Sequence, residues 1–279
     1  MKYINFTKEE QRKFMRLIKK KSNLTWESIT HSLTISRSMV FFYLNGESKI
    51  LKQNYEKLCS IANIRPRIKQ YVVINNKTKE IRLPSKADNS LAEFIGILAG
   101  DGHLSQINYE ISITCDSVTD KDYITNHVPK LIYKLFGLKA SIQKSKYARA
   151  IKCRIYSKKL CEFLNKEYGI PIGKKKGQLH IPLQLQKNEG FLKSYLRGLF
   201  DTDGSLYFRR KSGKVISIIS RDHSFLKEVK NALKQLNFSP SLSGKNLYIY
   251  NQEEINKFFS EIKPANSKHM KKYTNTISL

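Results

Sequence analysis

The chain has 279 residues, which exceeds one typical domain and is compatible with two or three. Its 51 lysine and arginine residues outnumber 23 acidic residues, which gives a formal net charge of +28. A protein with this excess repels itself unless a polyanion is present, so nucleic acid is the expected partner. A ribosome-like or membrane-surface basic protein is the alternative. A hydrophobic fraction of 40% excludes wholesale disorder.

The chain carries no recognisable secretion or membrane signal. Its first residues are charged and lack the apolar segment of a signal peptide. No apolar run approaches the ~20 residues that span a bilayer. The four cysteines show no CxxC spacing, so we expect buried, reduced thiols and no zinc site. We therefore expect a protein that is not secreted, works without a membrane, and resides in the cytoplasm or another intracellular compartment containing DNA.

Residues 1–65 predict a small all-α domain, with helices expected at 8–20, 26–33, 37–44 and 51–62. The second and third are joined by Thr34-Ile35-Ser36, and WESITHSLTISRSMVFFYLNGE resembles the repressor-type helix-turn-helix. At the start of the recognition helix, the expected DNA contacts are Ser36, Arg37 and Ser38. The alternative is a helical bundle that serves packing only. The adjacent Phe41 and Phe42 depart from the pattern, and we expect one of them in the core.

Residues 66–89 predict a connector with a hairpin that turns at Asn75-Asn76-Lys77.

From Ser90 onward the chain repeats itself. SLAEFIGILAGDGHLS is followed by FLKSYLRGLFDTDGSLYF, and six positions align at the constant offset of 102 residues that separates Asp101 from Asp203. Each motif has helical periodicity and ends at Asp-Gly. Each is followed by short β-branched runs and by further helical patterns. The sequence therefore predicts two α+β halves, 90–190 and 191–279, that form a pseudo-dimer within a monomeric chain.

The motifs carry small residues one helical turn apart, Gly96 with Gly100 and Gly198 with Thr202, as a close helix pair requires. Two carboxylates brought to one point repel each other, but divalent cations between them make the arrangement tolerable. Hard oxygen ligands suit magnesium, and a metal can activate water for phosphodiester hydrolysis.

FIGILAGDG (94–102) and LRGLFDTDG (196–204) resemble the nonapeptide of the LAGLIDADG homing endonucleases. The resemblance covers residues 90–279. It implies two pseudo-symmetric α/β repeats in a saddle-like monomer, with both motif helices at the centre, and cleavage of both strands of a long DNA duplex. It also implies that Asp101 and Asp203 hold Mg²⁺, or Mn²⁺ in its place, with the carbonyl oxygens of Gly100 and Thr202 as further ligands. Ala99 and Arg197 depart from the family pattern.

Two lysine-bearing segments complete the resemblance. YGIPIGKKKGQL, before the second motif, and IKPANSKHM, near the C-terminus, resemble family elements that bring a lysine close to the scissile phosphate. Lys175 and Lys268 are the expected catalytic lysines. Alternatively, they are solvated contacts to the phosphate backbone, and Lys174, Lys176 or Lys271 could take their place.

The strands predict DNA recognition, because a twisted β-ribbon fits the major groove and its alternating side chains face the base edges. Most of the basic candidates are expected to contact phosphate. They are Lys144, Lys146, Arg149, Lys152 and Arg154 in the first half, and Arg209, Arg210, Lys211, Lys214 and Arg221 in the second.

Two other functions remain open: a DNA-binding transcriptional regulator on an endonuclease-derived scaffold, and an RNA-splicing maturase that binds intron RNA. Loss of the metal-binding acids would favour the regulator, and both acids are present. The chain starts with Met and ends without a His-Asn pair, so we expect a free-standing or intron-encoded product of a mobile element, not an intein.

Overall fold

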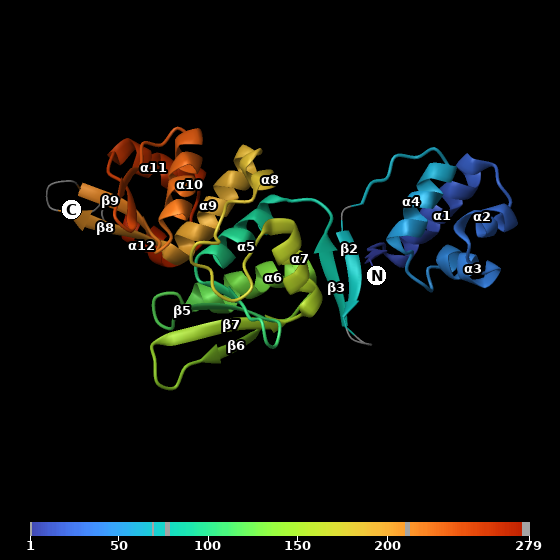
Figure 1. Ribbon diagram of the computed structural model, residues 1–279, viewed down its shortest axis with the longest axis horizontal. Coiled ribbons are helices and arrows are strands. Elements are labelled where there is room, and N and C mark those ends of the chain that lie inside the picture. Colours follow the sequence, from blue (N-terminus) through green and yellow to red (C-terminus); the bar gives the residue numbers. More distant parts are fainter. Residues whose placement is uncertain (1, 69, 76–78, 210–212, 275–279) are drawn as a thin grey trace. The chain divides into compact units, whose positions relative to one another are not determined.

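The computed structural model describes residues 2–68, 70–75, 79–209 and 213–274. It divides into two compact units, Met1–Lys86 and Ala87–Leu279, which are described separately (Figure 1). Within the described residues, no helix combines the length and the apolar character needed to cross a membrane.

In its described residues, the first unit contains four helices and a three-stranded sheet. The helices are α1 (Lys8–Ser22), α2 (Trp26–Leu33), α3 (Arg37–Asn45) and α4 (Lys52–Ile61). Side-chain oxygens cap the first three helices, and the caps are Thr7, Thr25 and Ser36. Helix α3 ends at Gly46, whose φ of +66° suits glycine. The core is formed by apolar faces of all four helices.

The expected connector is part of this first unit. Strands β2 (Gln70–Asn75) and β3 (Lys79–Pro84) form a hairpin, and β1 (Lys2–Ile4) pairs with β2. Strand β1 has only three residues and was not predicted from the sequence. Because this pairing ties the hairpin to the N-terminus, the unit extends to Lys86 and does not end at Arg65. Of the expected turn, Asn76 and Lys77 lie outside the described residues.

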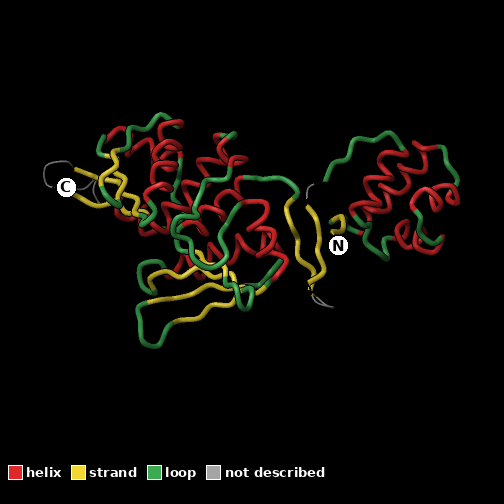
Figure 2. Tube along the Cα trace, in the orientation of Figure 1, coloured by secondary structure: helices red, strands yellow, loops and turns green. Residues whose placement is uncertain are grey.

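The first half of the second unit begins with the motif helix α5 (Asn89–Ala99). Four antiparallel strands form its sheet in the order β4-β5-β7-β6: β4 (Gly102–Leu104), β5 (Glu110–Asp116), β6 (Ser141–Lys144) and β7 (Ala150–Tyr156). Between β5 and β6 lie a π-helical turn, η1 (Tyr123–His127), and α6 (Val128–Phe136), to which the sequence analysis assigned no residues. Helix α7 (Lys158–Tyr168) follows β7, as expected. Figure 2 shows the helices over one face of this sheet.

The second half repeats this architecture. After the short α8 (Leu183–Gln186), it begins with the motif helix α9 (Glu189–Asp203). Its sheet has the order β8-β9-β11-β10, with β8 (Gly204–Arg209), β9 (Gly213–Ile219), β10 (Ser241–Ser243) and β11 (Asn246–Ile249). Its helices are α10 (His223–Gln235), α11 (Gln252–Glu261) and α12 (Ser267–Thr274). In both halves the strands therefore pair in the order first, second, fourth, third, which confirms the predicted repeat.

The two motif helices pack directly against each other. A Cβ atom added to Gly96 would lie 2.0 Å from the carbonyl oxygen of Tyr195, and one added to Gly198 would lie 2.1 Å from that of Glu93. No side chain larger than hydrogen fits at either position, because the facing atoms belong to the backbone. The predicted close approach of α5 and α9 is confirmed, and both helices end at the same place.

Candidate active site

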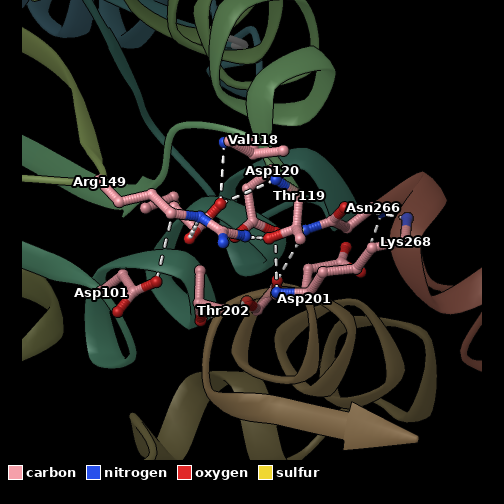
Figure 3. A network of polar contacts seen from close by, with 12 residues as sticks. Asp101, Val118, Thr119, Asp120, Arg149, Asp201, Thr202, Asn266 and Lys268 are labelled. Carbon is pink, nitrogen blue, oxygen red and sulfur yellow. Dashed lines mark hydrogen bonds and ion pairs between the residues drawn. The ribbon is translucent and has the colours of Figure 1, made fainter. Parts of the chain in front are cut away.

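The carboxylates of Asp101 and Asp203 approach each other where α5 and α9 end. Asp203 is the last residue of α9, and Asp101 follows two residues after the end of α5. Between them, Gly100 faces Thr202 so closely that an added Cβ would lie 2.0 Å from the Thr202 hydroxyl and 3.4 Å from the Asp203 carboxyl carbon. The expectation that both motifs bring their final acid to one point is therefore met (Figure 3 shows Asp101 beside Thr202).

Burial makes both carboxylates hard to ionise. Desolvation, together with the nearby charge of Asp101, raises the pKa of Asp203 to about 7. The pKa of Asp101 is also raised by desolvation, although Cys115, whose thiol lies 3.6 Å from its Oδ2 atom, acts in the opposite direction. The ammonium groups of Lys175 and Lys268 partly offset the burial of both acids. Two buried, mutually repelling carboxylates of this kind fit a divalent cation.

The donor set supports only part of a metal's coordination shell. In the part of the chain that the structure describes, no group of three or more His, Cys, Asp or Glu side chains could hold a metal ion. Asp101, Asp203 and neighbouring carbonyl groups are hard oxygen donors of the kind magnesium prefers. Magnesium usually keeps several other ligands from water and phosphate, so these residues fit a cation shared with a phosphate-bearing substrate.

Lys175 lies against the end of the first motif helix. Its Nζ atom donates hydrogen bonds to the carbonyl oxygens of Leu98, Ala99 and Gly100, at 2.9, 3.0 and 2.5 Å. A cation at this position also interacts favourably with the negative end of the helix dipole. The Gly100 carbonyl, an expected metal ligand, already accepts from Lys175, so a metal ion bound to this oxygen would share it with the ammonium group.

Lys268 is held differently, in a buried polar network that joins both halves (Figure 3). Its Nζ atom lies 2.8 Å from Oδ1 of Asp120, which precedes the π-helical turn. The side-chain amide of Asn266 donates to the same Asp120 oxygen at 2.6 Å and to the carbonyl oxygen of Asp201 at 3.1 Å. The Asp201 carboxylate in turn accepts from the backbone N–H groups of Ala265 and Asn266. The C-terminal segment is therefore fastened to the second motif helix and to the first half.

Sequence reasoning assigned no role to Asp120, Asp201 or Asn266. The one available signal was that Asp120 and Asp222 are separated by the same 102 residues as Asp101 and Asp203. Arg197, noted as a departure, also has a local role. Its Nε atom donates to the carbonyl oxygen of Ile262 at 2.9 Å, and its guanidinium lies 3.4 Å from buried Glu93.

On the first sheet, two of the five expected DNA contacts share the face that points away from the helices. Lys152 and Arg154 alternate with buried residues on β7, and both lie near Glu110 of β5, at 3.5 and 3.8 Å. Lys144 pairs in register with buried Ile151 and so belongs to the opposite face. Arg149 forms an ion pair with Asp116 at 2.7 Å, and Lys146 lies in the loop between β6 and β7.

The second sheet differs in chemistry. Arg209 is exposed at the end of β8, on the same face as Tyr207, and Arg221 is exposed just before α10. Lys214 lies over the ring of Tyr273 in α12, at 4.4 Å from its centroid, so it is on the side packed against helices and not among the outward-facing groups. This follows from the strand alternation, which places it on the face of buried Ile216. Arg210 and Lys211 lie outside the described residues.

In the first unit, the three expected contacts lie together at the start of α3. The Ser36 hydroxyl caps the helix and lies 3.0 Å from that of Ser38, and the Arg37 guanidinium lies over the Phe41 ring. The expectation that one of the paired phenylalanines is core is wrong, because Phe41 and Phe42 are 37% and 44% exposed. The core positions of α3 are taken by Val40 and Tyr43 instead.

Residues 190–263 match the model of the LAGLIDADG-like domain family. Residues 190–263 are therefore similar to a LAGLIDADG-like domain. Among curated proteins, the chain is 28% identical over 151 residues to a component of the A-type ATP synthase of Pyrococcus abyssi, covering 53% of the chain and 14% of that protein. It is 23% identical over 238 residues to an isomerizing glutamine–fructose-6-phosphate aminotransferase of Methanocaldococcus jannaschii, covering 84% of the chain and 21% of that protein.

The chain thus spans about a fifth or less of the length of these curated relatives. Among solved structures, the N-terminal LAGLIDADG domain of DUF199/WhiA aligns with a TM-score of 0.46 at 19% identity, covering 62% of the chain and 82% of that domain. The structure of I-DmoI in complex with DNA and Mn aligns with a TM-score of 0.45 at 19% identity, covering 62% of the chain and 96% of that protein.

The raised pKa of Asp203 predicts a pH-dependent loss of stability. Between its unfolded value of 3.8 and its folded value of about 7, the folded chain binds a proton that the unfolded chain does not. Stability should therefore fall as pH rises through this window, by about 1–4 kcal/mol from this group. Asp203→Asn removes the ionisation, so its melting temperature should exceed that of the wild type at pH 8 and approach it at pH 4.

Thermal unfolding without divalent metal, followed from pH 4 to 8, provides the measurement. The exposed Asp122→Asn is the matched control and should retain the wild-type pH dependence. A wild-type pH dependence in Asp203→Asn would contradict the burial of an ionisable carboxylate at this position.

Proposed function

We propose that this protein is a site-specific endonuclease that hydrolyses a phosphodiester bond on each strand of a long DNA duplex, with Mg²⁺ or Mn²⁺. The observation that carries this proposal is the meeting of Asp101 and Asp203, one from each repeat, at the adjoining ends of α5 and α9. Two equivalent acids related by an internal repeat suit two scissile bonds on strands of opposite direction.

The charge and the sheets support a DNA substrate. The net charge of +28 favours a polyanion, and the outward face of the first sheet carries Lys152 and Arg154. Side chains on such a face can contact phosphate or base edges in a major groove. The tyrosine-bearing face of the second sheet would contact a different part of the duplex, so an asymmetric target is expected.

In this mechanism a bound divalent cation supplies charge neutralisation and lowers the pKa of a water molecule. Asp101 and Asp203 would hold it. The ammonium groups of Lys175 and Lys268 lie within electrostatic range of both acids, where they would also neutralise charge that develops on a phosphate. Because the site is buried, each of these interactions is stronger than it would be in water.

A DNA-binding regulator that does not cut is the second candidate. Two observations favour it. Lys175 donates hydrogen bonds to the carbonyl oxygens at the end of α5, where a metal ligand is expected, and the first unit resembles a helix-turn-helix domain. Both candidates bind DNA, and they differ in whether the acids are needed for cleavage.

Replacing either acid by asparagine keeps the shape and removes the charge that would hold a cation. Asp101→Asn and Asp203→Asn should each lower double-strand cleavage by about three orders of magnitude or more, while duplex binding is retained or slightly tightened. Strand-specific cleavage of an end-labelled duplex, with Mg²⁺ and with Ca²⁺ as a non-catalytic control, measures the effect. Wild-type cleavage rates in both variants would rule out the proposed mechanism.

We also propose that the first unit extends the DNA contact. Its α3 N-terminus presents Ser36, Arg37 and Ser38, and the unit has its own core. Removal of residues 1–86 should weaken duplex binding and flatten the dependence of log K on log salt concentration, because fewer phosphate contacts release fewer counterions. Titrations of both proteins at several salt concentrations measure this. Equal affinities and equal slopes would assign the unit another role.

A further inference from the structure

Asp120 and Lys268 form a buried ion pair between the two halves. Their side chains are 7% and 21% exposed, and Nζ lies 2.8 Å from Oδ1. Asp120 also accepts from the Asn266 amide at 2.6 Å and from the Thr119 hydroxyl at 3.3 Å. An exposed pair of this kind would contribute little, but a largely buried one whose carboxylate accepts further hydrogen bonds fixes the position of its members.

The position so fixed is next to the candidate active site. Asn266, which donates to Asp120, also donates to the carbonyl oxygen of Asp201, two residues before Asp203, so the network that holds Lys268 reaches the end of α9. The ammonium charge of Lys268 acts on both Asp101 and Asp203. A lysine side chain has four rotatable bonds and would otherwise sample many positions. Asp120 restricts Lys268 to one of them, with its charge directed toward the first half.

Comparison of the two repeats shows that only one of the two equivalent aspartates pairs with a lysine side chain. Asp222 stands at the position equivalent to Asp120, and its Oδ2 atom accepts from the backbone N–H of Gly177 at 2.7 Å. Each aspartate thus holds the lysine-bearing segment of the opposite half. At Asp222, however, the contact is to the backbone, while the nearby Lys175 donates to helix carbonyls instead.

We infer that Asp120 is a positioning residue, which holds Lys268 of the second half beside the paired acids Asp101 and Asp203. This rests on the proposed endonuclease function. The asymmetry between Asp120 and Asp222 makes the two lysines unequal, since Lys268 is held by a carboxylate and Lys175 by carbonyl oxygens. Neither repeat is complete alone, because the lysine segment of each is fastened by the other.

A double-mutant cycle separates positioning from a merely structural role. Asp120→Asn should lower cleavage about tenfold or more, and Lys268→Gln should lower it at least as much. If Asp120 acts through Lys268, the double variant should cut no more slowly than Lys268→Gln alone. The exposed Asp122→Asn, which removes the same charge two residues away, serves as the matched control. Losses that multiply in the double variant would overturn the inference.

A second readout does not require cleavage. In the full chain, acetylation of Lys268 by acetic anhydride, followed by mass spectrometry, should be several-fold faster in Asp120→Asn than in the wild type. The exposed Lys174 should react equally in both and serves as the internal reference. Asp120→Glu retains the charge and should preserve much of the protection. Asp120→Ser, which also removes the charge, replaces Asp120→Asn if that variant does not fold.

Unchanged reactivity of Lys268 in Asp120→Asn, or in Asp120→Ser if only that variant folds, would overturn the pairing itself. If the wild type does not cut DNA but Lys268 becomes reactive as expected, the endonuclease proposal fails and the pairing stands.

Discussion

The close approach of α5 and α9 is the constraint on which the rest of the second unit depends. At Gly96 and Gly198 the backbone of each helix lies against the other, so neither position accommodates a side chain. Contact at this distance fixes the positions of the two helix ends relative to each other, and it therefore brings Asp101 and Asp203 together. The sheets, which follow directly from the two helix ends, are placed by the same contact.

This geometry has an electrostatic cost. Two acids that would prefer water are buried beside each other, and desolvation raises the pKa of both. The chain offsets part of that cost with two lysines from outside the motifs. The two lysines are held by different means, since Lys268 pairs with Asp120 and Lys175 donates to carbonyl oxygens at the end of α5. The motifs differ as well, because Asp201 of the second motif accepts from residues 265 and 266, while Ala99 at the equivalent position of the first motif has no carboxylate.

Much of this arrangement could be predicted from the sequence because it depends on local or repeated features. The 102-residue offset predicted the two halves, and small residues at helical spacing predicted the close contact. Other features depend on partners distant in the sequence. Lys268 and Asp120 are 148 positions apart and belong to different repeats. The hairpin at 70–84 belongs to the first unit because it pairs with β1, a strand of only three residues.

The lysine and arginine residues expected to contact DNA from the strands also divide into those that could be placed from the sequence and those that could not. Alternation along β7 places Lys152 and Arg154 on one face, as the period of a strand requires. The same alternation places Lys144 and Lys214 on the faces of their sheets that pack against helices. This could be recognised only from the pairing of Lys144 with Ile151 and from the contact of Lys214 with Tyr273. On α3, Phe41 and Phe42 both stay at the surface because Val40 and Tyr43 already fill the core positions of a nine-residue helix.

The most direct test of the central claim is to incubate the purified protein with a randomised duplex library and Mg²⁺, and to sequence the cut ends. If two equivalent acids act on two strands, the ends should share one asymmetric sequence, with both strands cut at a fixed stagger. They should disappear when Ca²⁺ replaces Mg²⁺. A library that is bound but never cut, or is cut without sequence preference, would contradict the account.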